Sequence, residues 1–219
     1  MPPMSDSRDD FDSNRPVPVW DQNPPARPAW QSEGERTEFE NPWMRVTSHP
    51  ATAPTGAPAT YVVMRPKNLA AGVLPIHADG TVTLVGQARF PFANYSWEMP
   101  EGGAPYEEDP LEGAKRELAE EAGLTARSWR EVLRLELSNS VTDERAICWL
   151  AWDLTAVDQA PDPTEVIQLA RVPFMTLIRE IDRGAIRDAL TVATALRAYH
   201  MARESLIPGW LAHAMLTRV

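Results

Sequence analysis

The residues of one segment in the middle of the chain predict where a helix begins, where it ends and which of its faces is buried. Asp109 followed by Pro110 is a helix start, because an acidic N-cap accepts backbone N–H groups and proline fits the first turn. Glu112 completes a capping box, and Gly123 ends the helix because glycine adopts the left-handed conformation without strain. The apolar stripe between these ends consists of Leu111, Ala114, Leu118 and Ala122. We expect a helix of about 11 to 13 residues that packs on a sheet.

The remaining face of this helix carries carboxylates. Glu117, Glu120 and Glu121 project over neighbouring turns, with Cβ atoms about 5–6 Å apart, and like charges so placed weaken a helix. Hard divalent cations such as Mg²⁺ bind grouped carboxylates and complete their shells with water and substrate phosphates. A charged run on a helix is more often a solvated face, so these glutamates alone do not decide for a metal site.

The segments on both sides of this helix have β patterning. Residues 71–76 and 81–87 flank the turn sequence His-Ala-Asp-Gly and predict a β-hairpin. Residues 133–140 and 146–154 predict a second hairpin. The other expected elements are strands over residues 61–65 and 166–172 and helices over residues 173–183 and 186–204.

The N-terminal part differs in composition from the rest. Twelve of the 21 prolines lie within the first 66 residues, and no apolar periodicity is present before about residue 38. Such a stretch cannot bury enough surface to offset its ordering entropy, which predicts a disordered tail over residues 1–38. The alternative is a short arm whose Trp20 and Trp30 dock on the body or on a second chain. The remaining divisions that we expect are a β arm over 39–66, a main domain over 67–205 and a C-terminal extension over 206–219.

Composition excludes several classes of protein. A net charge of −10 argues against a duplex-DNA binder, and no nucleic-acid partner is expected. The single cysteine, Cys148, excludes an internal disulfide framework and a multi-cysteine zinc site, and we interpret it as a small buried hydrophobe. No apolar run is long enough to cross a membrane, and the first residues lack the pattern of a secretory signal. These features predict a cytoplasmic protein with no membrane partner.

A longer pattern surrounds the glutamates. Residues 102–124 read GGAPYEEDPLEGAKRELAEEAGL, which resembles the Nudix box G-x5-E-x7-R-E-U-x-E-E-x-G-U, where U is a bulky aliphatic residue. The matching residues are Gly102, Glu108, Arg116, Glu117, Leu118, Glu120, Glu121, Gly123 and Leu124. The resemblance extends from residue 41 to about residue 199. It implies an α/β fold, an α/β/α sandwich around a mixed sheet, here with an N-terminal β arm and the tail.

The resemblance also implies a chemistry, the metal-dependent hydrolysis of nucleoside diphosphates linked to another moiety. Glu117 and Glu121 would be the main ligands of Mg²⁺ or Mn²⁺, and Glu120 and Glu108 would bind a further ion or polarise its water. Such cations invert the field of an acidic cleft, so that an anionic pyrophosphate can bind there. They also lower the pKa of bound water and neutralise charge on the leaving phosphate.

Other roles follow from the same resemblance. Arg116 would pair with the glutamates and hold their rotamers, and Gly102 would make the turn. The backbone carbonyl of Glu101 would join the metal shell, and this residue stands where relatives usually have alanine.

The flanking sequence indicates a branch of the family. Gln87-Ala88-Arg89 and the approach Trp97-Glu98-Met99-Pro100 resemble the ADP-ribose and nucleoside-diphosphate-sugar pyrophosphatases, with Arg89 as candidate pyrophosphate clamp. Residues 138–144 stand where many ADP-ribose hydrolases carry Ser-Pro-Gly and then a glutamate; Glu144 fits this glutamate, but the proline is absent. Other diphosphate sugars therefore stay open.

The residue that would act as the general base and the residue that would bind the nucleobase both lie outside the Nudix box. Relatives often use a glutamate in a loop after the second hairpin, which ranks Glu165 first, Glu144 second and Asp162 third. Trp43 lies where relatives place an N-terminal strand that is exchanged between subunits and stacks on the nucleobase, which implies a homodimer.

We therefore expect hydrolysis of a nucleoside diphosphate sugar, ADP-ribose first, to a nucleoside monophosphate and a sugar phosphate. The alternatives are the same chemistry on a dinucleoside polyphosphate, an oxidised nucleotide or an RNA 5′ end, or a ligand-sensing regulator built on this fold.

Overall fold

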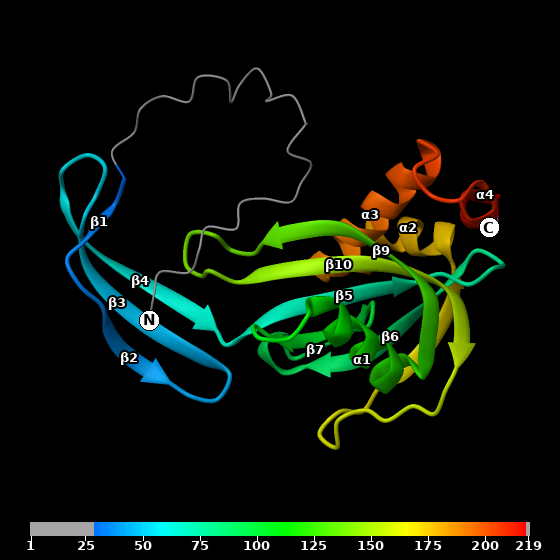
Figure 1. Cartoon of the computed structure of the whole chain (residues 1–219), viewed down its shortest axis with the longest axis horizontal. Coiled ribbons are helices and arrows are strands. Elements are labelled where there is room, and N and C mark those ends of the chain that lie inside the picture. Colours follow the sequence, from blue (N-terminus) through cyan, green and yellow to red (C-terminus); the bar gives the residue numbers. More distant parts are fainter. Residues whose placement is uncertain (1–28, 218–219) are drawn as a thin grey trace. The chain divides into compact units, whose positions relative to one another are not determined.

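The computed structural model describes residues 29–217 (Figure 1). The strands are β1 (Gln31–Ser32), β2 (Arg36–Glu40), β3 (Met44–Thr52), β4 (Pro58–Pro66), β5 (Asn68–Pro75), β6 (Thr81–Arg89), β7 (Asn94–Glu98), β8 (Glu101–Pro105), β9 (Leu124–Glu136), β10 (Arg145–Ala156) and β11 (Gln168–Pro173). The helices are α1 (Pro110–Ala122), α2 (Phe174–Asp182), α3 (Ala189–Arg203), α4 (Gly209–Thr217) and the short 3-10 helix η2 (Phe90–Phe92).

Part of the expected tail, between residues 31 and 38, forms regular structure. Residues 1–28, including Trp20, lie outside the described residues, but β1 and β2 occupy part of the stretch for which we expected no regular structure. The reason is pairing: short polar strands without periodicity of their own are stabilised by hydrogen bonds to β3.

The described residues form two compact units. The smaller unit comprises residues 29–35 and 49–61, and the larger unit comprises residues 36–48 and 62–217. In the smaller unit, β1 pairs with β3 from Gln31 opposite Thr52, and the ring of Trp30 packs edge to face on Tyr61 at 5.2 Å. In the larger unit, β2 pairs antiparallel with the first half of β3.

The larger unit contains two further sheets. One has the strand order β8-β5-β10-β9 and is mixed, since β5 and β10 are parallel while the outer pairs are antiparallel. The other has the order β11-β6-β7 and is antiparallel. The mixed sheet agrees with the fold class expected from the sequence.

The first expected hairpin is only partly correct. The turn is present, with the His77 N–H donating to the Thr81 carbonyl at 2.8 Å, and the flanking strands meet in a single bridge between Ile76 and Val82. Beyond this bridge β5 and β6 enter different sheets. Both edges of β5 are occupied by β8 and β10, so β6 has no ladder to join there. The second hairpin is confirmed as β9 and β10, with β9 beginning directly after α1.

Helices cover both faces of the mixed sheet, and the alternation of side chains in β10 shows how. Ile147, Trp149 and Ala151 pack in one cluster with the apolar stripe of α1. Ala146, Cys148 and Leu150 pack in a second cluster with α2, α3 and α4. Figure 1 shows α2, α3 and α4 gathered together, away from α1. This is the expected α/β/α sandwich.

Local signals set the ends of α1. The Asp109 side chain accepts the Leu111 N–H at 3.0 Å, and Gly123 caps the other end at φ 61°. The expected helices over residues 173–183 and 186–204 are confirmed within a few residues as α2 and α3, and α4 forms within the expected C-terminal extension. Cys148 is fully buried, and burial raises the pKa of its thiol to about 11, as expected of a hydrophobic core residue. Within residues 29–217, no helix has the length and apolar character to cross a membrane.

Candidate active site

The acidic face of α1 lies against the start of β8. The Glu121 carboxylate accepts the backbone N–H of Glu101 at 3.0 Å. The Glu117 carboxylate fills the space beside Gly102, where an added β-carbon would stand 2.3 Å from the carboxyl carbon. Glu117 and Glu121 are therefore aligned along the backbone of residues 101–102, the place where the sequence predicted the main metal ligands.

The charged forms of both carboxyl groups are destabilised, and a bound cation would stabilise them. The pKa of Glu121 is raised to about 8, chiefly by burial and also by the neighbouring Glu117 and Glu165. Burial, followed by repulsion from Glu120, raises the pKa of Glu117 to about 7. Grouped, partly buried carboxyls with raised pKa values are typical of functional sites.

Arg116 holds the outer part of the box. Its guanidinium donates to both oxygens of Glu108, at 2.7 and 3.0 Å, and to the Gly103 carbonyl at 3.0 Å. The arginine therefore connects the loop before α1 to β8. Glu108 is engaged in this ion pair.

The residues present fit a divalent cation in part. Glu117 and Glu121 supply hard oxygen ligands beside the Glu101 backbone, and both are destabilised as bare anions. In the described part of the chain, however, no three His, Cys, Asp or Glu side chains gather closely enough to form a metal site. Of the five expected ligands, the structure brings the Glu117 and Glu121 carboxylates to the Glu101 backbone, whereas Glu108 lies in the loop before α1 and pairs with Arg116. The Glu101 side chain turns toward Arg89.

The loop after β10 is fastened to the end of α1. The Val157 N–H donates to the Gly123 carbonyl at 2.9 Å, the Ala160 N–H donates to the Glu120 carbonyl at 3.1 Å, and the Gln159 amide donates to the Glu121 carbonyl. These bonds bring the following segment toward the acidic face.

The three candidate bases separate in this arrangement. Glu165 lies close enough to Glu117 and Glu121 to raise the pKa of both carboxyls. The Asp162 carboxylate is engaged within its own loop, where it accepts the backbone N–H of Thr164 at 2.8 Å and the Thr164 hydroxyl at 2.6 Å. Glu144 lines a cavity together with Trp43 and Gly102.

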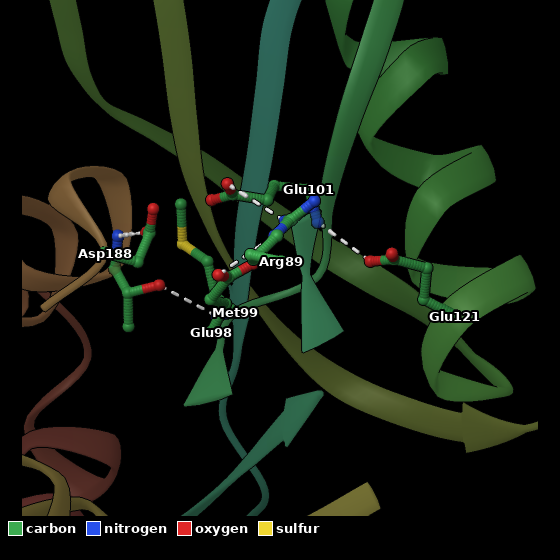
Figure 2. Close-up of polar contacts among 7 residues, drawn as sticks. Arg89, Glu98, Met99, Glu101, Glu121 and Asp188 are labelled. Carbon is green, nitrogen blue, oxygen red and sulfur yellow. Dashed lines mark hydrogen bonds and ion pairs between the residues drawn. The ribbon is translucent and has the colours of Figure 1, made fainter. Parts of the chain in front are cut away.

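Arg89 is fixed by a residue to which the sequence analysis gave no role. The side chain of Glu98 is only 4% exposed and accepts two hydrogen bonds from Arg89 Nε, at 3.1 and 3.0 Å, and a third from the Nη2 group (Figure 2). The second carboxylate near this guanidinium is Glu101, at 3.9 Å. Glu98 stood within the quoted Trp97-Glu98-Met99-Pro100 segment, but only the structure shows that it faces Arg89.

Two cavities meet at Arg89 and Glu101. The smaller, about 260 Å³, is lined by both of these residues and by Trp43, Gly102 and Glu144. The larger, about 560 Å³, is lined by the same two residues together with β7 and the α2–α3 loop. Four expected site residues, Trp43, Arg89, Glu101 and Glu144, are thus brought to one cavity.

Comparisons with known proteins agree with this geometry. Residues 66–193, more than half of the chain, match the family model described as the NUDIX domain. An ADP-ribose pyrophosphatase of Mycobacterium tuberculosis is 27% identical over 133 residues, covering 59% of this chain and 64% of that protein. An ADP-ribose pyrophosphatase of Bacillus subtilis is 27% identical over 124 residues, covering 56% of this chain and 67% of that protein.

Two further matches differ in extent. An RNA pyrophosphohydrolase of Caulobacter vibrioides is 44% identical, but over only 55 residues, or 25% of this chain and 31% of that protein. A crystal structure of an ADP compounds hydrolase superposes with a TM-score of 0.73 at 19% identity, covering 82% of this chain and 97% of the other. This last match concerns the fold.

Proposed function

The chain belongs to the NUDIX domain family, and on this premise we propose that it hydrolyses the pyrophosphate bond of a nucleoside diphosphate sugar. ADP-ribose is the first substrate, and the products are a nucleoside monophosphate and a sugar phosphate. One observation carries the proposal: the carboxylates of Glu117 and Glu121 lie on the Glu101–Gly102 backbone, next to the cavities that meet at Arg89. The two ADP-ribose pyrophosphatases that match over more than half of this chain support the choice of substrate.

Glu117 and Glu121 would hold Mg²⁺ or Mn²⁺, with the Glu101 carbonyl beside them. A divalent cation there supplies positive charge for the diphosphate and lowers the pKa of an attacking water. Arg116 keeps Glu108 and β8 in place, so the acidic face retains its shape. Glu120 adds a further carboxylate within electrostatic reach of Glu117 and would polarise water at this face.

Arg89 would clamp the diphosphate. Glu98 binds the Nε edge of the Arg89 guanidinium, so the other N–H groups of this guanidinium are oriented before the substrate binds. This orientation reduces the entropy lost on binding. A guanidinium is a suitable partner for phosphate because its planar donors match two oxygens at once.

Glu165 would act as the general base. It lies within electrostatic reach of Glu117 and Glu121, so a water activated at these carboxylates is also near Glu165. Glu144 is the second candidate, and it lines the smaller cavity with Trp43.

Trp43 would stack on the nucleobase, and a homodimer would enclose it. Three large apolar side chains of the larger unit are exposed on the arm strands and their connections: Phe39 at 51%, Trp43 at 74% and Val62 at 50%. Exposed apolar groups of this kind favour packing against a second copy. Light scattering at micromolar concentration should give the mass of a dimer, and a monomer whose Trp43→Ala variant is kinetically silent would contradict this assembly.

The protein would act in the cytoplasm, in keeping with a buried free thiol at Cys148. No nucleic-acid or membrane partner is proposed. The match to an RNA pyrophosphohydrolase covers a quarter of the chain, so an RNA 5′ end ranks below the diphosphate sugars.

A substrate panel tests the proposal. ADP-ribose, GDP-mannose, UDP-glucose, diadenosine polyphosphates, oxidised nucleoside triphosphates and a 5′-triphosphorylated RNA are each incubated with Mg²⁺ and with EDTA. We expect Mg²⁺-dependent turnover with the highest kcat/KM on a diphosphate sugar. Binding of ADP-ribose without turnover would instead favour the ligand-sensing regulator.

A further inference from the structure

The larger cavity lies between β7 and the loop that joins α2 to α3. Its volume is about 560 Å³, which is in the range of small-molecule sites. Asn94, Tyr95 and Ser96 line one side, and Arg187 and Asp188 line the other. The box glutamates of α1 do not line this cavity.

Arg89 and Glu101 line this cavity and also the smaller one. A diphosphate has two substituents, and one held at Arg89 at the junction can direct one substituent into each cavity. With the nucleoside in the cavity of Trp43, the larger cavity is left for the other half of the molecule.

The chemistry of the larger cavity suits a polyhydroxylated group. Carboxyl groups of Glu98, Glu101 and Asp188 line it beside the guanidinium groups of Arg89 and Arg187. Carboxyl oxygens accept hydrogen bonds from hydroxyl groups, and guanidinium N–H groups donate to hydroxyl oxygens, so this lining can bind several hydroxyls at once. Among the described residues, the buried Oε2 of Glu101 has no hydrogen-bond partner, so a ligand hydroxyl would satisfy it.

The walls of the cavity are held in place by the fold. The ring of Tyr95 packs edge to face on Trp97 at 5.6 Å. Asp188 caps α3 by accepting the Thr191 N–H at 2.7 Å, and the Thr191 hydroxyl accepts the Met99 N–H at 2.9 Å, next to the strand end that carries Glu98 (Figure 2). The loop of Asp188 is thereby tied to the strand that positions Arg89. A cavity whose walls are held in place in this way can discriminate between ligands by their shape and hydrogen bonding.

We propose that this cavity is the sugar subsite, and that Asp188, Asn94 and Glu101 select the sugar by accepting its hydroxyl hydrogens. The inference rests on the proposed function, which supplies the diphosphate held at Arg89. It assigns a role to Glu101, the residue that departs from the alanine of similar proteins: its backbone serves the acidic face of α1 and its side chain serves the sugar.

The two products of ADP-ribose hydrolysis, AMP and ribose 5-phosphate, separate the two cavities in one experiment. Their inhibition constants are measured for the wild type and for Asp188→Asn, Asn94→Ala and Trp43→Ala. Asparagine is also a good N-cap, so Asp188→Asn removes the charge while it can keep the start of α3. Phe90→Ala, which removes a 96% exposed ring outside both cavities, is the matched control. Thermal unfolding of each variant verifies that it is folded.

We expect Asp188→Asn and Asn94→Ala to weaken inhibition by ribose 5-phosphate by about tenfold, the loss of one hydrogen bond to a charged or polar partner, with AMP inhibition unchanged. Trp43→Ala should do the reverse, and Phe90→Ala should change neither. If the cavity variants weaken AMP instead, or change neither constant, the subsite assignment is overturned while the hydrolase proposal stands. A folded wild type that hydrolyses no diphosphate sugar overturns the proposed function, and this inference with it.

Discussion

The Glu117 carboxylate occupies the space that a β-carbon at residue 102 would need, with 2.3 Å between that position and the carboxyl carbon. We therefore expect Gly102→Ala to push the Glu117 carboxylate away from the Glu101–Gly102 backbone. The displaced group is the far end of a flexible side chain, so the fold should survive. Loss of a correctly placed ligand should lower kcat/KM by roughly 10- to 100-fold, which steady-state kinetics will measure.

Gly103→Ala is the matched control for this variant. It adds the same atom to the same strand, but the new β-carbon would meet the side chain of Asn68, at 2.8 Å, and not Glu117. Equal loss of activity in both variants would show that β8 tolerates no added atom and that the Glu117 contact is not the cause.

The pH dependence of stability follows from the same carboxyl groups. In the metal-free fold the pKa values of Glu117 and Glu121 are raised from 4.5 to about 7 and about 8, so the folded state holds protons that the unfolded state releases. Their contribution to stability is full below pH 4.5 and is lost as the pH rises through about 7 to 8. Urea unfolding in EDTA should therefore show a free energy of unfolding that falls between pH 5 and pH 8.

Glu121→Gln should flatten this fall, because the amide does not titrate. Mg²⁺ should stabilise the wild type more at pH 8 than at pH 6, since the cation binds the deprotonated carboxylates. A wild type and a Glu121→Gln variant with the same slope would contradict the assignment of the raised pKa to Glu121.

The paired N–H donors of the Arg89 guanidinium should contribute more to substrate binding than its charge alone. Arg89→Lys keeps a positive group but cannot make the parallel contacts to Glu98 and to a phosphate at the same time. We expect KM for ADP-ribose to rise by about tenfold with a smaller change in kcat, since the lost contact is made in both ground and transition states. Unchanged KM would mean that the charge of Arg89, and not its bidentate geometry, serves the substrate.

The catalytic base can be assigned by comparing two isosteric variants. Glu165→Gln should lower kcat by about 10²–10⁴ with little change in KM, because it removes a proton acceptor needed in the transition state. Glu144→Gln should be close to wild type in kcat. The opposite result would transfer the role to Glu144.

Local rules predicted α1 almost completely. Asp109, Pro110 and Gly123 act on their own neighbourhood, so its ends could be placed from the sequence alone. The pairing of β5 and β6 could not be placed in this way, because it depends on β8 and β10 occupying both edges of β5. Helix α4 was not predicted because it is apolar on nearly all sides and lacks a periodic apolar stripe. It is buried by packing with α2 and α3.

The site residues likewise differ in whether local sequence could predict them. The glutamates of α1 were predicted since they share one helix, where spacing alone gives proximity. The pairing of Glu98 with Arg89 joins residues nine positions apart on two antiparallel strands. The register places Glu98 opposite Val85 and not opposite Arg89, so strand pairing inferred from the sequence would not have indicated this contact. The cavity that contains Asp188 joins segments about 90 residues apart, and no spacing in the chain indicates it.

The central claim is that this acidic face cleaves a pyrophosphate bond, and ³¹P NMR of ADP-ribose with the purified protein tests it most directly. With Mg²⁺ we predict that the paired diphosphate resonances give way to two monophosphate resonances, those of AMP and ribose 5-phosphate. EDTA should stop the conversion, and folded Glu121→Gln should be slower by orders of magnitude. Diphosphate resonances that persist with wild-type protein and Mg²⁺, or that vanish equally fast with Glu121→Gln, would contradict the account.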